Sequence, residues 1–414
     1  MSRPLVLVLV DDAATAAWEP FALTRPASEL LFGALTFRRR AELVFGVPAA
    51  AVVAPAHLVA FSEDGAPPVR TEVPTVETDR LLWRSRAVPD WSLRDRWLRE
   101  RPTEPTALVA GDTVVGLLLP AGAATPPWRG GWDDADSTWA AWPRQVIPAR
   151  TVDHVWQLVL DTPAQLAVDI VALHPEAGPP PLPAGVVRRG SHPVVLGRDV
   201  DLEPPVVLDT RHGPIWLDDG VEVRAFTRVV GPLYAGPGTI LLGGPIGPAA
   251  LGPVCRVRGE FAESVALGYV NKQHDGHIGH AYLGRWVNLG AGTTNSDLKN
   301  TYGPVRLRTA RGEVDTGALK LGCFLGDHVR TAIGTLLNTG TIVGAASNLF
   351  GVGMPPKRVP PFAWGFGPAA TTMRLDAFLD TARRVMARRG IPWTAPLQAH
   401  WTRVWQEAQR ACAS

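Results

Sequence analysis

The pattern of hydrophobic and polar residues divides the chain into regions of different character. Residues 5–10, LVLVLV, form a continuous apolar run that ends at Asp11 and Asp12. A run this short predicts a buried strand, because it cannot span a membrane or form the core of a signal peptide. The stretch 18–46 predicts a loop followed by a helix, and TALVAGDTVVG at 106–116 predicts a later strand. The N-terminal region therefore predicts an α/β sheet.

The middle of the chain repeats every six residues. An α-helix repeats at 3.6 residues and a flat strand at 2, so a sustained period of six with glycines between predicts a hexapeptide β-helix, in which three hexads close one coil. The alternative is an ordinary β-sandwich with many Gly-Pro turns. The apolar or small residues in period are Ile215, Val221, Thr227, Leu233 and Thr239, then Leu283 and Leu289, then Leu325, Thr331, Leu337, Val343 and Leu349.

Two proline-rich stretches predict the boundaries. HPEAGPPPLPAG, 174–185, cannot hold a helix or a central strand, and it separates the mixed region from the six-residue repeat. After GMPPKRVPPFAWGFG, 353–367, helical spacing of apolar residues returns, which predicts two helices. We therefore expect an α/β domain at 1–180, a β-helix at 185–360 and a helical tail at 361–414.

Composition and charge indicate a globular protein. The 414 residues are 46% hydrophobic with a formal net charge of +2, which gives no reason to expect a nucleic acid or membrane partner. The basic runs FRRR at 37–40 and ARRVMARRG at 382–390 are expected to line solvated helix faces. Cys255, Cys323 and Cys412 are too few and too far apart for a disulfide framework, which favours a cytoplasmic location.

The stretch NKQHDGHIGHAYLGRWVNLGAGTTNSDLKN, 271–300, interrupts the repeat, and so does 300–320, which predicts a protruding loop. Gly279 follows His274 after five residues, and Asn288 follows it after fourteen, where it opens an Asn-Leu-Gly-Ala-Gly-Thr segment. This spacing resembles the left-handed β-helix acyltransferases. The most similar are the acetyltransferase halves of the bifunctional N-acetylglucosamine-1-phosphate uridylyltransferase/glucosamine-1-phosphate acetyltransferase family.

The resemblance implies roles for individual residues in acetyl transfer from acetyl-CoA to an amino sugar. His274 would be the general base, since an imidazole titrates close to working pH, and Asp275 or a backbone carbonyl would fix its tautomer. The glycines at 290 and 292 would leave amide groups free for an oxyanion. Acetyl-CoA would contact Gly290, Ala291, Gly292 and Asp297, and the sugar phosphate would contact Asn288, His277, Lys272, Lys299, Arg256 and Arg258.

Two departures and one alternative stay open in this stretch. His277 stands where the family has a tyrosine, and Asp297-Leu298 stands where it has Asn-Tyr. The three histidines of this stretch, His274, His277 and His280, also allow a zinc site like that of the β-helical carbonic anhydrases, although their spacing differs.

The N-terminal region resembles the sugar nucleotidylyltransferases, which have a Rossmann-like α/β fold. Leu23-Thr24-Arg25-Pro26 is kept, but no glycine-rich loop follows the first strand, and Ala27 replaces the family's lysine. The resemblance implies that Asp11, Asp12 and Arg25 bind the nucleotide and that Asp112 binds Mg²⁺.

Together these features predict a bifunctional enzyme of nucleotide-sugar biosynthesis. It would acetylate an amino-sugar 1-phosphate, with glucosamine-1-phosphate as the expected substrate, and join the product to a nucleotide from UTP or another NTP. The resemblance implies a homotrimer. Two alternatives are an acyltransferase whose N-terminal domain has lost catalysis, which the missing glycine loop favours, and a non-catalytic β-helix scaffold or binding protein.

Overall fold

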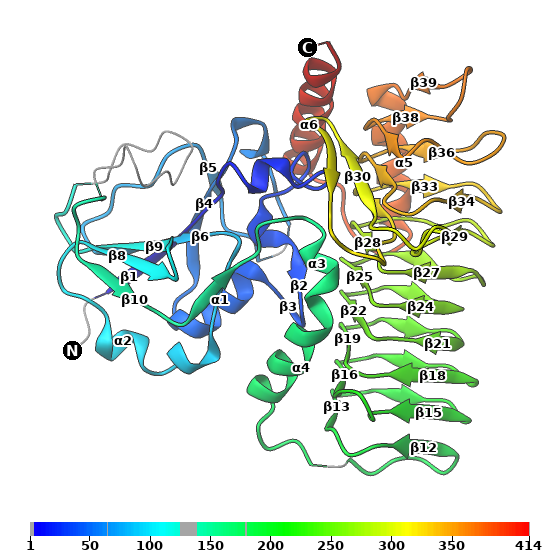
Figure 1. The fold of residues 1–414 in the computed structure, drawn as a ribbon, viewed down its shortest axis with the longest axis horizontal. Coiled ribbons are helices and arrows are strands. Elements are labelled where there is room, and N and C mark those ends of the chain that lie inside the picture. Colours follow the sequence, from blue (N-terminus) through cyan, green and yellow to red (C-terminus); the bar gives the residue numbers. More distant parts are fainter. Residues whose placement is uncertain (1–3, 64, 125–138, 179, 414) are drawn as a thin grey trace.

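The computed structural model describes residues 4–63, 65–124, 139–178 and 180–413, and it contains an α/β domain, a parallel β-helix and two C-terminal helices (Figure 1). In the described part of the chain, no helix is long and apolar enough to cross a membrane.

The N-terminal domain is built on a seven-stranded sheet of order β10-β8-β9-β6-β1-β4-β5. The predicted first strand is β1 (Leu5–Val10), and it pairs in parallel with β4 and β6. It is central because Leu7 and Leu9 pack on one side and Val8 and Val10 on the other. The other strands are β4 (Ala49–Val53), β5 (Val69–Arg70), β6 (Asp79–Arg84), β8 (Thr106–Ala110), β9 (Thr113–Leu119) and β10 (Arg144–Val146).

Short helices and small strand pairs surround this sheet. Helix α1 (Phe37–Phe45) begins where the Thr36 hydroxyl accepts a hydrogen bond from the Arg39 N–H, and it ends at Gly46, whose φ of 72° is readily adopted by glycine. The remaining elements are β2 (Leu31–Phe32), β3 (Leu35–Thr36), β7 (Ala87–Pro89), β11 (Ala149–Thr151), α2 (Trp97–Glu100), α3 (Gln157–Leu160) and α4 (Thr162–Leu173).

One basic run differs from its prediction. Arg40 in FRRR is fully buried and pairs with Asp169 of α4, so α1 does not present this arginine to solvent. The buried Arg40–Asp169 salt bridge joins α1 to α4. The pattern of charges along the sequence does not predict this pairing.

The predicted hexapeptide β-helix is confirmed. Its parallel ladders exclude a β-sandwich, and every period-six residue named above is buried. Face 1 contains β12 (Val186–Arg189), β15 (Val206–Asp209), β18 (Thr227–Val230), β21 (Gly244–Ile246), β24 (Glu260–Ala262) and β27 (His277–Gly279), and the pair β29 (Thr294–Asn295) and β34 (Leu336–Leu337) follows.

Face 2 is the longest ladder, with nine strands. They are β13 (Val194–Leu196), β16 (Ile215–Leu217), β19 (Leu233–Ala235), β22 (Ala249–Leu251), β25 (Ser264–Ala266), β28 (Tyr282–Leu283), β32 (Phe324–Leu325), β35 (Ile342–Val343) and β37 (Arg358–Val359).

Face 3 is continued across its middle by Asn288, which bridges β26 to β33. Its strands are β14 (Asp201–Leu202), β17 (Glu222–Val223), β20 (Ile240–Leu241), β23 (Arg256–Val257), β26 (Asn271–Lys272), β33 (Arg330–Thr331), β36 (Asn348–Leu349), β38 (Ala363–Trp364) and β39 (Thr371–Thr372).

The N-terminal domain packs along face 2, with α3 and α4 between its sheet and the β-helix (Figure 1). Tyr282 anchors this interface, because its hydroxyl donates to the Leu31 carbonyl at 3.0 Å and accepts from the Leu31 N–H at 2.9 Å. The outward side chains Tyr234, Ala250, Val265, Tyr282 and Phe324 share one buried cluster with Phe21 and Leu166. Face 2 is therefore an internal surface.

The second interruption forms a β-hairpin, β30 (Arg306–Thr309) and β31 (Gly312–Asp315). It folds back toward the N-terminal domain, where the Ala310 N–H donates to Glu19 at 2.8 Å. The C-terminal helices α5 (Leu375–Ala387) and α6 (Ala395–Ala413) pack on the β-helix through Phe378 and Trp401.

Candidate functional site

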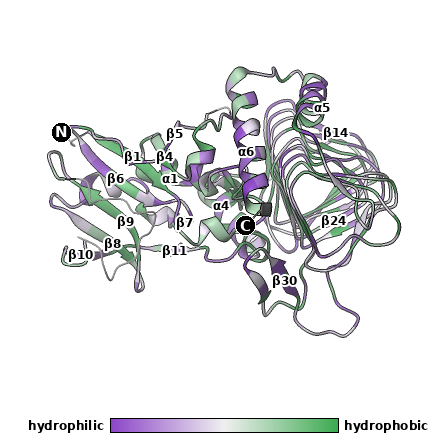
Figure 2. Ribbon diagram, turned by 90° about the horizontal axis from the view of Figure 1, so that it is seen from above, coloured by the Kyte–Doolittle hydropathy of each residue, from purple (hydrophilic) through white to green (hydrophobic). Residues whose placement is uncertain are grey.

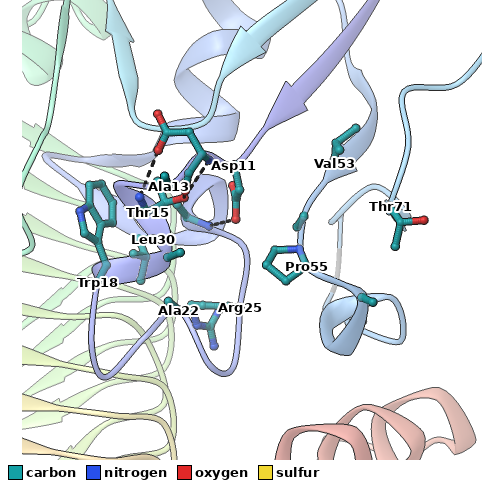
Figure 3. Close-up of a pocket in the computed structure, with 15 residues that line it drawn as sticks. Asp11, Ala13, Thr15, Trp18, Ala22, Arg25, Leu30, Val53, Pro55 and Thr71 are labelled. Carbon is teal, nitrogen blue, oxygen red and sulfur yellow. Dashed lines mark hydrogen bonds between the residues drawn. The ribbon is translucent and has the colours of Figure 1, made fainter. Parts of the chain in front are cut away.

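A cavity of about 310 Å³ lies at the carboxyl ends of β1 and β4, where a nucleotide binds in this class of sheet (Figure 3). Asp11, Thr15, Trp18, Val53 and Thr71 contribute to its wall. We call it the N-terminal pocket.

Asp11 is the most unusual group in the N-terminal pocket. Its Oδ2 accepts a hydrogen bond from the Ala27 N–H at 3.1 Å, while its Oδ1 is buried and has no hydrogen-bond partner in the described part of the chain. Ser85 lies near the carboxyl group without the geometry of a hydrogen bond. Burial raises the pKa of Asp11 to about 7, so this carboxyl group gains and loses its proton near neutral pH.

Asp12 is already neutralised by arginines. Its Oδ2 accepts hydrogen bonds from Arg84 and Arg86, both at 2.7 Å, and its Oδ1 accepts one from the Thr15 N–H at 3.1 Å. Burial alone would raise the pKa of Asp12, but the two guanidinium groups outweigh it and lower the pKa. Asp12 therefore holds the turn after β1 in place.

Arg25 touches the wall of the N-terminal pocket, but its charged group has partners on other sides. Its guanidinium is buried between Glu63, at 2.9 Å, and Asp327 of the β-helix, at 2.8 Å. Arg285 also binds Glu63, at 2.7 Å. Arg25 is an ion-pair partner that joins the N-terminal domain to the β-helix, and its predicted contact with a nucleotide stays a prediction.

The predicted Mg²⁺ site does not fit this arrangement. Asp112 lies in the turn between β8 and β9, at the same edge of the sheet as Asp11 but three strands away, which is about 14 Å at the usual strand spacing. It does not line the N-terminal pocket. Among the described residues, no group of three or more histidine, cysteine, aspartate or glutamate side chains is placed to hold a metal ion.

His274 lies at the corner between faces 3 and 1 of the β-helix. Its side chain is exposed and makes no hydrogen bond to any residue that the structure describes. The carboxylate of Asp275, expected to orient the imidazole, instead pairs with Arg258 at 3.2 Å. The imidazole is therefore free to meet a ligand.

Lys272 occupies an inward position of face 3, beside Val257 in the ladder. Its side chain is buried, and its ammonium donates to the carbonyl oxygens of Arg258, at 2.7 Å, and His274, at 2.8 Å. Burial lowers the pKa of Lys272 to about 8. The predicted phosphate contact is corrected, because the ammonium faces into the prism and holds the His274 corner from inside.

Asn288 lies outward on face 3 and pairs with an asparagine of the preceding coil. Its Oδ1 accepts a hydrogen bond from Asn271 Nδ2 at 2.8 Å. In turn, Asn271 Oδ1 accepts one from Gln273 Nε2 at 2.7 Å. The Asn288 side chain is half-buried, and its amide N–H groups point to no acceptor among the described residues.

The glycine segment after Asn288 differs from its prediction. The Gly290 N–H donates to the Thr331 hydroxyl at 3.0 Å, and the Gly292 N–H donates to the Asp275 carbonyl at 3.1 Å. These amides are therefore not free to stabilise an oxyanion. The Ala291 N–H, between them, has no acceptor in the described part of the chain.

The other two histidines interact with carboxylates along face 1. His277 Nδ1 lies 3.3 Å from Glu260, and His280 lies between Glu263 and Asp297, with 2.8 Å from its Nδ1 to Asp297 Oδ2. Burial lowers the pKa of His280, but the two carboxylates outweigh burial and raise it. Asp297 is thus a partner of His280, and its predicted contact with acetyl-CoA gains no support from this geometry.

The remaining predicted cations have internal partners of different strength. Lys299 Nζ donates to the Pro304 carbonyl at 2.7 Å, and Arg258 binds both Asp275 and the Leu242 carbonyl. Within the described residues, Arg256 makes a single long contact, 3.5 Å, to the Val254 carbonyl. Among the cations predicted to bind phosphate, Arg256 is the one that the described residues leave without a strong partner.

Residues 7–176 match the family model of the sugar nucleotidyl transferases. The N-terminal domain is therefore similar to this family over most of its length. The predicted resemblance and fold class are thereby confirmed, and the matches together support a transferase.

Three relatives match over part of their length. A bifunctional sugar-1-phosphate nucleotidylyltransferase/acetyltransferase from Sulfurisphaera tokodaii is 31% identical over 91 residues, 22% of this chain and 23% of the relative. Bifunctional GlmU proteins from Stenotrophomonas maltophilia and Nitrosospira multiformis are 36% and 34% identical, over 27% and 29% of this chain. The matches cover less than a third of each relative, 28% and 30% for the GlmU proteins.

Three residues beside Asn288 were missed by the sequence analysis, namely Asn271, Arg330 and Arg389. A signal for the first two exists: each directly precedes an inward residue of face 3, as Asn288 precedes Leu289, so its side chain must point outward. Arg389 has no such signal, because only the fold brings the end of α5 to this face, at 3.5 Å from Asn271.

Proposed function

We propose that the β-helix transfers an acetyl group from acetyl-CoA to the amine of an amino-sugar 1-phosphate, with glucosamine-1-phosphate as the first substrate to test. The observation that carries this proposal is the exposed imidazole of His274, which has no hydrogen-bond partner among the described residues. The next coil of the β-helix carries Asn288 and the Ala291 N–H above this corner. A scaffold needs only the repeat, and it has no use for a free imidazole at such a corner.

The chemistry needs three groups, and the corner offers one for each. The sugar amine attacks the thioester carbonyl while His274 removes the amine proton. The oxyanion that forms is stabilised by an N–H donor, for which Ala291 is the available amide. When the C–S bond breaks, the proton on His274 passes to the departing thiolate, which leaves the amide product and free coenzyme A.

A second candidate function is nucleotidylyl transfer from UTP or another NTP to the sugar 1-phosphate in the N-terminal pocket, coupled to acetylation. The family match and the names of the relatives favour it. The state of Asp11, Asp12 and Arg25 favours the alternative, in which the domain binds a ligand without catalysis. Mg²⁺ belongs to the coupled reaction, and no step here is assigned to it.

The assembly that we propose is a homotrimer in which faces 1 and 3 approach neighbouring chains, since face 2 is covered by the N-terminal domain. Size-exclusion chromatography with light scattering tests this. A monomer at micromolar concentration would contradict it.

Mass spectrometry of products from glucosamine-1-phosphate, acetyl-CoA, UTP and Mg²⁺ tests both candidates with the full chain. We expect acetylated sugar phosphate from the wild type and a loss of at least 100-fold in His274→Ala, the usual scale for a general base. His212→Ala, which removes an exposed histidine elsewhere on the β-helix, is the matched control.

The same experiment separates the alternatives. A UDP-sugar peak shows an active N-terminal domain, and acetylation without that peak shows the acyltransferase alone. No acetylation of this or related amino sugars by the wild type refutes the proposal and leaves the binding or scaffold reading.

A further inference from the structure

An outward row on face 3 contains two asparagines with one arginine on each side of them. Arg256 pairs in the ladder with Asn271, Asn271 with Asn288, and Asn288 with Arg330, each one coil apart, about 4.8 Å. Arg389, just beyond α5, reaches the same row through Asn271. Figure 2 shows α5 over the corner next to the face that contains β14. We call Arg256, Asn271, Asn288, Arg330 and Arg389 the arginine–asparagine row.

The hydrogen bonds inside this row leave only donors facing outward. Asn288 Oδ1 is taken by Asn271, and Asn271 Oδ1 is taken by Gln273 and Arg389. The Asn288 amide N–H groups and the Arg330 guanidinium have no acceptor in the described part of the chain. A surface of donors without acceptors is complementary to an anion.

The charges of the row are also uncompensated. Arg256, Arg330 and Arg389 are all half-buried, and none forms a salt bridge with a described carboxylate. Other arginines on the same β-helix do: Arg258 pairs with Asp275 and Arg228 with Asp209. Burial lowers the pKa of both Arg330 and Arg389, and Arg256 repels Arg389. Cations gathered and partly dehydrated without a counter-charge are costly unless an anion binds them.

We infer that the arginine–asparagine row binds a phosphoryl group, and that Arg389 makes the C-terminal helices part of the ligand site. Guanidinium groups bind two phosphate oxygens at once, and the Asn288 amide supplies a further donor between them. The inference rests on the proposed function only for the source of the phosphoryl group. Both the sugar 1-phosphate and the phosphates of coenzyme A have the required chemistry.

Isothermal titration of the full-length chain separates the two sources. The ligands are glucosamine-1-phosphate against glucosamine, and coenzyme A against pantetheine, with inorganic phosphate as the simplest probe. We expect Arg330→Gln and Arg389→Gln each to lower the affinity for a phosphorylated ligand by about 10-fold or more, which is the effect of losing one charge-assisted hydrogen bond. Glucosamine and pantetheine should bind these variants as they bind the wild type.

Two further variants keep the test clear. Arg384→Gln removes an exposed arginine from the same helix α5 and should leave every affinity unchanged. Arg330→Lys keeps the charge but not the planar fork, so it should fall between the wild type and Arg330→Gln. If Arg330→Gln fails to fold, Arg389→Gln carries the test, since this residue lies beyond the helix end and outside the β-helix ladder.

Each outcome has one meaning. If the variants bind only glucosamine-1-phosphate more weakly, the row binds the phosphate of the acetyl acceptor. If they bind only coenzyme A more weakly, the row binds the phosphates of the acetyl donor. If folded Arg330→Gln and Arg389→Gln bind all ligands and inorganic phosphate like the wild type, the inference is wrong. If the wild type does not acetylate, but inorganic phosphate raises its melting temperature and not that of the variants, the proposed function fails and the phosphoryl site stands.

Discussion

Replacement of Arg25 by methionine tests whether this residue joins two domains or binds a nucleotide. Its guanidinium makes four hydrogen bonds, two to Asp327 and two to Glu63. In Arg25→Met the buried cluster keeps the two carboxylates but only Arg285 as a counter-charge. The free energy of unfolding of this variant should be lower than that of the wild type. The ligand affinity of its N-terminal pocket should equal that of the wild type.

The magnitude follows from burial. Arg25 and Asp327 have side chains only 2% and 3% exposed, so loss of one partner leaves a buried charge, which costs about 3–5 kcal/mol. Glu63 is 21% exposed and keeps its bond to Arg285, so it adds little to this cost. Arg39→Met is the matched control, because the Arg39 side chain is 55% exposed and its pair with Glu42 is worth at most about 1 kcal/mol.

Urea unfolding followed by tryptophan fluorescence and far-UV circular dichroism measures the loss, provided that the two probes report one transition. Asp327→Asn and the double variant Arg25→Met/Asp327→Asn complete a double-mutant cycle. The double variant should lose less stability than the two single variants together, by about 1–3 kcal/mol, because Asp327→Asn removes the charge that Arg25→Met leaves unpaired. If Arg25→Met unfolds like the wild type but loses nucleotide binding, our reasoning is wrong and the original prediction from sequence is right.

Three further changes have outcomes fixed by the structure. The pKa of Asp11 is raised to about 7 from an ordinary 3.8, so ionising this carboxyl group lowers the stability of the fold as pH rises through that range. In urea unfolding, Asp11→Asn should therefore be more stable than the wild type by about 1–4 kcal/mol at pH 8. At pH 4 it should be no more stable than the wild type. Lys272→Met should cost about 1–3 kcal/mol, because two carbonyls lose their donor, and a stabilised variant would contradict this. The raised pKa of His280 gives stability that is full below pH 6.5 and lost as pH rises through the folded value. Asparagine tolerates the φ of 48° at this position, so His280→Asn should remove mainly the charge. The variant should therefore lose more stability relative to the wild type at pH 5.5 than at pH 9.

The architecture was readable from the sequence because each part has its own period. A continuous apolar run such as LVLVLV predicts a strand that is buried on both faces. A sustained six-residue repeat predicts a β-helix with the repeated apolar or small residues in its interior. The packing of the N-terminal domain on face 2 was not readable. Tyr282 and Phe324 look like any outward residues of a β-helix, and only the fold shows that Leu31 and Phe21 cover them.

The site was predicted less well because a motif gives residue types but not their partners. His274 and Asn288 were found by spacing, and both are placed with free polar groups. Lys272 and Arg25 were assigned to phosphates because they are cations near a motif, yet one is held by two carbonyls and the other by two carboxylates. Arg389 could not be found at all, since more than one hundred residues separate it from Asn271 in the chain.

The close packing of the domains limits how they can be studied apart. In a segment 185–414, the outward side chains of face 2, including Tyr234, Tyr282 and Phe324, would lose their cover, and Asp327 would lose Arg25. Exposed apolar patches of this kind promote association, so we expect this segment to aggregate or to bind dye probes of hydrophobic surface, unlike the full chain. A soluble, well-folded segment with full acetylation would show that face 2 is not a structural interface. For this reason point variants of the intact chain are the better test of each activity.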